Sequence, residues 1–180
     1  MATLKAFFRG GLVLALCLGA TPGRAEVPVS AAEVRAVFTY NFLSFVDWPP
    51  EFFTTREAPL VIGVCGDPEI TDALNKVIVG EKVKGRPIRI MEVKEAADVG
   101  ACHILYVAAG REEIMTAVRS GRKILTVGET DRFAAAGGII RFVTERNRVK
   151  LQVNLAAAHA AALAISSQLL RIAEVTGRPE

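Results

Sequence analysis

The spacing of hydrophobic residues changes along this chain, and each change predicts an element of secondary structure. Four apolar runs at 60–65, 87–91, 102–107 and 123–127 predict strands, and the first is continuous, as in a strand that is buried on both faces. Segments 70–79 and 112–120 instead repeat their apolar residues at helical spacing. Strands that alternate with short helices favour parallel pairing. The sequence therefore predicts a single α/β domain with a mostly parallel sheet flanked by helices.

The segment from Phe133 to Val175 predicts a different arrangement. Two apolar runs at 139–143 and 149–153 flank a polar turn, which indicates a β-hairpin and makes the sheet mixed. Asn154 is a good N-cap, and apolar residues recur at helical spacing after it, so we expect a long C-terminal helix. Gly177 suits the left-handed position at the end of that helix.

A helix is also expected near the start of the domain. Ser30 and Glu33 have the spacing of a capping box, which marks a helix N-terminus. The helix carries an aromatic stripe, which is usually core: Phe38, Phe42, Phe45 and Trp48. Tyr40 and Asn41 lie beside the stripe. Because buried Tyr and Asn side chains need hydrogen-bond partners, we expect these two to pin the helix to the sheet.

Residues 1–25 have the features of a secretory signal peptide, namely a basic start, a short apolar run and a small-x-small cleavage site ending at Ala25. Cleavage there would leave one exported domain, 26–180. A retained membrane anchor is a weaker alternative, because the apolar run is short for a bilayer. A lipoprotein modified at Cys17 is also weaker, because the large Leu16 precedes the cysteine.

The charge of the mature domain excludes one class of partner. The chain has 22 basic and 19 acidic residues, and segment 1–25 holds three of the basic residues and no acidic one. The mature domain therefore has 19 of each sign and a net charge of zero. A nucleic-acid partner is not expected, because it would need a basic stripe.

No catalytic motif is visible. The chain lacks a nucleophile elbow and a phosphate-binding glycine loop, and its two histidines, His103 and His159, have no neighbouring ligands at metal spacing. We therefore expect neither an enzyme nor a metal or cofactor site. The acids Asp67, Glu129 and Asp131 follow predicted strands, where open α/β folds bind ligands. They could hold a cation or act as acid and base, but turn and helix-capping roles are several times more common.

Signal cleavage would leave two cysteines, Cys65 and Cys102. Two cysteines in an exported domain can form a disulfide. They can equally be buried free thiols, which behave as small hydrophobic side chains.

Several motifs, in order, resemble the YfiR family and together cover about Glu33 to Val175. They are 33–49 (EVRAVFTYNFLSFVDWP), 85–87 (GRP), 102–106 (CHILY), 125–128 (LTVG), Phe133 with 137–138 (GG), 153–155 (VNL) and 166–170 (SSQLL). The resemblance implies a periplasmic, non-enzymatic repressor. Such a protein binds the periplasmic domain of an inner-membrane diguanylate cyclase and so limits cyclic di-GMP and biofilm formation. A histidine kinase as receptor and a homodimer are further alternatives.

The resemblance also implies a partner-binding surface and a cysteine pattern. Position by position, the surface falls on Ile140, Gln152 and Ala158, and the family often has a carboxylate where this chain has Gln152. The usual cysteine partner of Cys102 falls on Gly63, whereas the cysteine here is Cys65. A two-residue shift moves the thiol by about 6–7 Å along a strand, so a disulfide and two free thiols are both open.

The family's second cysteine pair, near Ala134 and Arg141, is absent, which weakens redox control as a hypothesis. The alternative to a repressor is a periplasmic small-molecule-binding protein that serves a sensing or transport complex. Such a protein would use the strand ends around Asp67 and Asp131.

Overall fold

The computed structural model describes residues 29–48, 52–53, 55, 57–118, 123–146 and 148–177. The signal peptide predicted at 1–25 lies outside these residues. In chain order the elements are α1 (Ala31–Phe45), β1 (Val46–Asp47), β2 (Leu60–Cys65), α2 (Pro68–Val77), β3 (Lys82–Val83), β4 (Arg86–Glu92), η2 (Asp98–Ala101), β5 (Ile104–Val107), η3 (Glu112–Ala117), β6 (Leu125–Gly128), α3 (Asp131–Ala135), β7 (Ile140–Glu145), β8 (Arg148–Asn154), α4 (Leu155–Ala160), β9 (Ala164–Ile165), α5 (Ser167–Leu170) and β10 (Ala173–Thr176).

The main sheet has eight strands in the order β10-β8-β7-β6-β5-β2-β4-β3. The pairs from β4 through β2, β5 and β6 to β7 are parallel, as is β10 with β8, whereas β7–β8 and β3–β4 are antiparallel. The predicted α/β class with a mixed, mostly parallel sheet is therefore confirmed. A second, small sheet joins β1 to β9.

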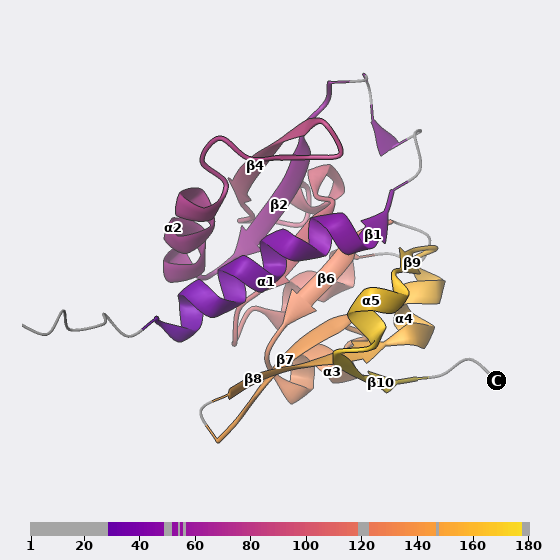
Figure 1. Ribbon diagram of the computed structural model, residues 1–180. Helices are drawn as coiled ribbons and strands as arrows, with labels where there is room; N and C mark the ends of the chain where they lie inside the picture. Colours follow the sequence, from indigo (N-terminus) through magenta and orange to yellow (C-terminus); the bar gives the residue numbers. More distant parts are fainter. Residues whose placement is uncertain are drawn as a thin grey trace, which may run out of the picture.

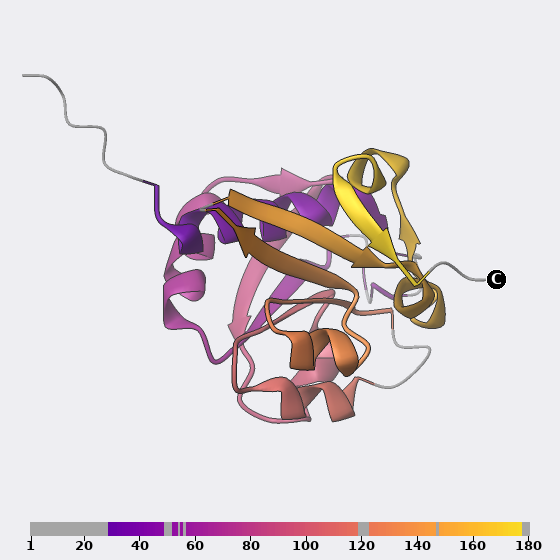
Figure 2. The same cartoon turned by 90° about the horizontal axis from the view of Figure 1, so that it is seen from below.

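Helices cover the two faces of the sheet unequally (Figures 1 and 2). On one face α1 crosses the strands, with α2 on one side of it and α4 and α5 on the other. The larger core lies under these helices. It includes strand residues whose side chains point to this face, such as Ile62, Tyr106 and Phe142. On the other face η2, η3 and α3 cover the central strands, over a smaller core around Leu105 and Phe133.

The first helix begins and packs as predicted. Ser30 accepts a hydrogen bond from the backbone of Glu33, and the Glu33 carboxylate accepts one from the backbone of Ser30, which completes the capping box. Phe42 is fully buried, and its ring stacks on Phe142 at a centroid distance of 6.0 Å, with Phe38 close to both. The aromatic stripe thus fixes α1 to the hairpin.

The predicted hairpin is present as β7 and β8. Glu145 pairs with Arg148, and the register runs along the strands to Ile140 opposite Val153. Asn154 ends β8 and caps α4, because its side chain accepts a hydrogen bond from Ala157.

The predicted long C-terminal helix is wrong. α4 stops at Ala160, and Ala162 has a φ of 52°, in the left-handed region that ends a helix. The rest of the segment forms β9, α5 and β10 instead. The reason is tertiary: β10 pairs with the edge of β8 and β9 pairs with β1, so strand hydrogen bonds outweigh the local helical pattern. Gly177 has the expected positive φ of 58°, but it ends β10 rather than a helix.

Candidate partner-binding face and strand-end pocket

On the sheet face opposite α1, α3 lies at the start of β7, whereas no described helix covers β8 and β10 (Figure 2). We call this surface the outer face. Directly paired residues share a side of a sheet, and Gln152 on β8 pairs with Arg141 on β7 and with Glu174 on β10. Val143 and Lys150 form the next pair on the same side. The outer face is therefore mainly polar and carries both signs of charge.

Strand alternation positions this face. Leu151 and Val153, the neighbours of Gln152, are 3% and 0% exposed and belong to the main core, so Gln152 points away from it. Two ion pairs flank it, one between Lys150 and Glu145 and the other between Arg141 and Asp131. Gln152 lies between these pairs with its own side chain partly exposed.

The structure separates the three residues at which the family resemblance placed the partner surface. Ile140 is 0% exposed and Ala158 is 1% exposed, because both contribute to the core beneath α1 and α4. Their side chains are therefore not available to a partner in this conformation. Only Gln152 lies on an accessible surface.

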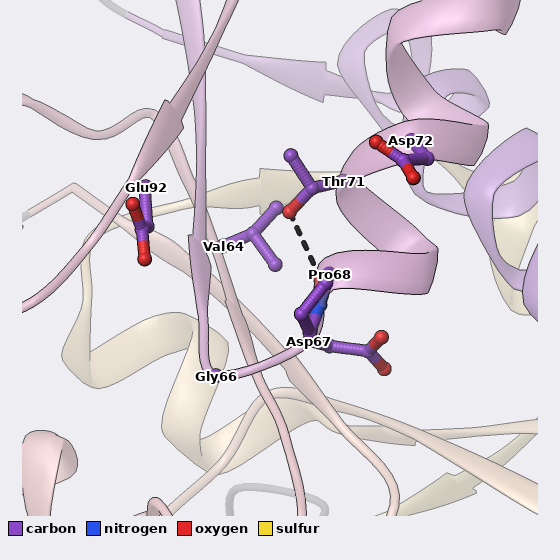
Figure 3. A pocket seen from close by; sticks show the side chains of 7 residues that line it. All are labelled: Val64, Gly66, Asp67, Pro68, Thr71, Asp72 and Glu92. Atoms are coloured by element: carbon purple, nitrogen blue, oxygen red, sulfur yellow. Dashed lines mark hydrogen bonds between the residues drawn. The ribbon is translucent and has the colours of Figure 1, made fainter.

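A pocket of about 300 Å³ lies at the carboxyl ends of β2 and β4 (Figure 3). It is lined by Val64, Gly66, Asp67, Pro68, Thr71, Asp72 and Glu92. Asp67 caps α2, because its Oδ1 accepts the N–H of Ile70 at 3.0 Å. Asp72 and Glu92 are exposed, and Glu92 forms an ion pair with Lys94 at 3.2 Å, so part of the negative charge at the pocket is already compensated.

Asp131 is not part of this pocket. It begins α3 and pairs with Arg141, whereas Asp67 follows β2, two strands away from β6. At about 4.8 Å between neighbouring strands, the two strand ends are about 10 Å apart. The two acids proposed for a single small-molecule site therefore serve separate roles.

Glu129, one of the three acids predicted at the strand ends, belongs to a partly buried polar group with Tyr106 and Arg35, two residues that the sequence did not single out. The hydroxyl of Tyr106 donates to Glu129, and Arg35 on α1 forms an ion pair with Glu129 and donates to Tyr106 at 3.4 Å. Tyr106 is fully buried, and burial together with the Glu129 hydrogen bond raises the pKa of its phenol. These contacts tie α1 to the centre of the sheet.

Tyr40, which was predicted to pin α1 to the sheet, contributes less to this attachment than Arg35 does. Tyr40 donates to Glu81 at 3.1 Å on the surface, which fixes α1 to the turn after α2 rather than to the sheet. The sequence feature that could have indicated this polar group is Arg35. It is a charged residue one helical turn before Thr39, and Thr39 is fully buried. Only the register of α1 over β5 reveals its partners.

A second polar residue is buried at the other end of β5. His103 is 5% exposed, and its ring lies 5.0 Å from the rings of both Phe52 and Phe53 and 5.8 Å from that of Trp48. Burial, and secondarily the charge of Arg86, lowers the pKa of His103 to about 4. The imidazole is thus neutral at pH 7 and has a structural role.

Cys65 and Cys102 are free, buried thiols in the structure, which is the second of the two alternatives. Cys65 ends β2 and pairs with Val107, whereas the Sγ of Cys102 lies over Gly63, where a Cβ would overlap it. The two-residue offset separates the sulfur atoms. Burial raises the pKa of Cys65, and it raises that of Cys102 to about 12, so both thiols are protonated at neutral pH.

The described residues contain no group of three or more His, Cys, Asp or Glu side chains that could hold a metal ion. Within the same residues, no helix has both the length and the apolar character that crossing a bilayer requires.

Comparisons with known proteins identify a family. A family model described as YfiR/HmsC-like matches residues 32–174. No match was found among curated protein sequences. Two solved structures are similar to the chain, each with a TM-score of 0.48. One is an ABC domain in complex with L-Trp from Streptococcus pneumonia, at 11% identity over 77% of this chain and 59% of that one. The other is a conserved domain protein from Vibrio cholerae O1 biovar eltor strain N16961, at 14% identity over 82% and 60%. The chain thus spans about three fifths of the length of these structures.

Proposed function

Because this chain belongs to the YfiR/HmsC-like family, we propose that it is a periplasmic regulator that binds the periplasmic domain of an inner-membrane diguanylate cyclase and represses it. We propose no catalytic role for it. The signal peptide expected at 1–25 and cleavage near Ala25 are part of this proposal.

The observation that supports binding most directly is the outer face. A sheet face that carries Arg141, Gln152 and Glu174 in one row, bordered by α3 only at Arg141, is a polar surface suited to a protein partner. Gln152 supplies both a donor and an acceptor at its centre. Residues Ile140 and Ala158 would act beneath it, by fixing the shape of the strand and of α4.

Repression by binding requires differential affinity. A protein that prefers the inactive receptor shifts its two-state equilibrium by the ratio of the two affinities, and a 100-fold preference corresponds to about 2.7 kcal/mol. Loss of contacts on the outer face would therefore activate the cyclase.

The test is a Gln152→Arg substitution, which places a second cation beside Arg141. We expect a Gln152→Arg protein that folds normally but no longer co-purifies with a membrane diguanylate cyclase, with higher cyclic di-GMP in the cells. The matched control is Asn75→Arg on α2, an exposed position far from the outer face. If Gln152→Arg retains full repression, the outer face is not the docking surface.

A second candidate function rests on the strand-end pocket of Figure 3. Its volume of about 300 Å³ suits a small ligand, and Asp72 could contact a cationic group there, while Glu92 would have to exchange its ion pair with Lys94. A thermal-shift screen of amine-bearing metabolites tests it. A stabilising compound should lose its effect in the Asp72→Asn/Glu92→Gln double variant, and a screen without any stabilising compound would count against this function.

A further inference from the structure

Two cationic residues occupy the left-handed region of backbone space in hairpin turns. Lys84 has a φ of 51° between β3 and β4, and Arg146 has a φ of 48° between β7 and β8. Two residues connect the strands in each case, because Val83 pairs with Arg86 and Glu145 pairs with Arg148. Such turns favour Asn or Gly, since a larger residue with positive φ brings its Cβ against a carbonyl oxygen.

The contacts of Lys84 account for its position. Its Nζ donates to the carbonyl oxygen of Val46 at 3.2 Å and forms an ion pair with Asp47. Lys84 thereby ties the β3–β4 turn to β1. The strained backbone at Lys84 therefore places its ammonium group against partners on β1.

Arg146 has the same backbone strain but no ion-pair partner among the described residues. Its side chain is exposed, and within the described residues no ion pair joins it or the neighbouring, exposed Arg148 to an acid. The nearby Lys150 is already paired with Glu145. These four residues line a concavity of about 550 Å³ at the hairpin tip.

The positive charge is local to this hairpin. Segment 139–154 contains three arginines and one lysine against a single acid, Glu145, whereas the predicted mature domain is neutral. The hairpin also projects beyond the helices, away from the C-terminus (Figure 1). A neutral domain thus presents a basic projection.

We propose that Arg146 and Arg148 form a recognition site for carboxylates on an acidic protein surface. This inference rests on the proposed function, because the acidic surface would belong to the receptor that docks on the adjoining outer face. A guanidinium group binds a carboxylate through two parallel hydrogen bonds, and a concave tip suits a projecting acidic side chain. A membrane surface fits less well, because none of the large exposed hydrophobic side chains, Val29, Val37, Val79 and Ile172, is among the four residues that line the concavity.

The experiment titrates a hexaglutamate peptide into the isotopically labelled domain and follows backbone amide shifts by NMR. We expect the shifts to concentrate at 144–150 in 50 mM salt and to be largely lost at 300 mM, as for exposed ion pairs. The Arg146→Gly/Arg148→Gln double variant should bind about tenfold more weakly, which is the effect of two ordinary surface ion pairs. The control Lys76→Gln removes an exposed cation from α2 and should leave binding unchanged.

Arg146→Gly alone separates recognition from a structural role. Glycine relieves the positive φ, so the melting temperature should stay the same or rise while peptide affinity falls. A variant that lost both stability and affinity would contradict the inference. So would unchanged affinity in the double variant, or tip shifts caused only by phosphatidylglycerol vesicles and not by the peptide.

The two proposals fail in different ways. If the wild-type protein does not co-purify with any diguanylate cyclase, the proposed function fails, and the peptide titration still decides whether the tip binds carboxylates. If the wild type and the Arg146→Gly/Arg148→Gln variant co-purify equally with the cyclase, the proposed function stands and the inference is overturned.

Discussion

The imidazole of His103 completes the pairing of β2 with β5. Its Nδ1 accepts the backbone N–H of Val61 at 3.1 Å, while the backbone N–H of His103 donates to the carbonyl oxygen of Val61 at 2.9 Å. A side chain thus takes the place of a main-chain acceptor at the point where β5 begins. Because Nδ1 accepts, the ring proton of neutral His103 is on Nε2, which has no partner in the described residues.

This arrangement predicts a loss of stability in acid. The folded-state pKa of His103, about 4, is lower than its ordinary value of 6.5, so the unfolded chain binds a proton more readily. The contribution of neutral His103 to the free energy of unfolding is therefore intact above pH 6.5. It is lost as the pH falls towards 4, by on the order of 3 kcal/mol in total. Urea unfolding between pH 7 and 4 measures it.

The control for this prediction is His103→Gln, which keeps an acceptor for Val61 but cannot titrate. Carboxylates also lose stability in acid, so the informative quantity is the difference between the two proteins. The wild type should lose more stability than His103→Gln between pH 6.5 and 5. If the free energies of unfolding of the two proteins fell in parallel with pH, His103 would not titrate in this way.

Arg35 and Glu129 should show strong energetic coupling. Arg35→Met leaves Glu129 beside Tyr106 without its cation, and Glu129→Gln leaves the partly buried guanidinium without its anion. Each single substitution should destabilise the fold by about 1–3 kcal/mol, and the double variant by clearly less than the sum. A double-mutant cycle by chemical denaturation measures the coupling. Simple additivity would contradict the contact.

Gly63 should not tolerate a side chain. A Cβ at this position would overlap the Sγ of Cys102 and lie 2.7 Å from the Cγ2 of Val93, so Gly63→Ala should cost about 1–3 kcal/mol. Adding Cys102→Ala removes one of the two clashes and should recover part of that loss. Full stability of the single Gly63→Ala variant would show that this layer is not close-packed.

The native thiols should be unreactive. Cys65 and Cys102 are both 0% exposed, and the raised pKa values keep the thiolate fraction small. We expect a thiol reagent at pH 8 to label neither in native protein and both after denaturation, with no added reductant. Denatured, unreduced protein without reactive thiols would instead indicate a disulfide.

Proline substitutions test whether residues 173–176 form a strand. The N–H of Asn154 donates to Ile139, the residue before β7, so by alternation the main-chain groups of Val153 face β10. The parallel register then turns those of Glu174 towards β8 and those of Ala173 towards the free edge. Glu174→Pro should therefore destabilise by roughly 2 kcal/mol, and Ala173→Pro by much less. If residues 173–176 formed a helix instead, both proline substitutions should cause large and similar losses of stability.

The sequence by itself determined the local elements. The apolar runs at 60–65 and 102–107 became central strands, the alternation at 149–153 became β8, and Ser30 and Asn154 cap helices as their types predict. These outcomes depend on interactions within a few residues of the chain, or on burial of a whole strand, and both leave a periodic signal.

Only the tertiary structure decided the rest. It ended α4 at Ala160 because the edges of β8 and β1 offered hydrogen bonds to later residues, and it placed Glu129 beside Arg35 across 94 positions of sequence. It also buried Ile140 while leaving Gln152 accessible. Strand order and helix register fix such contacts, and the spacing of residues along the chain does not encode them locally.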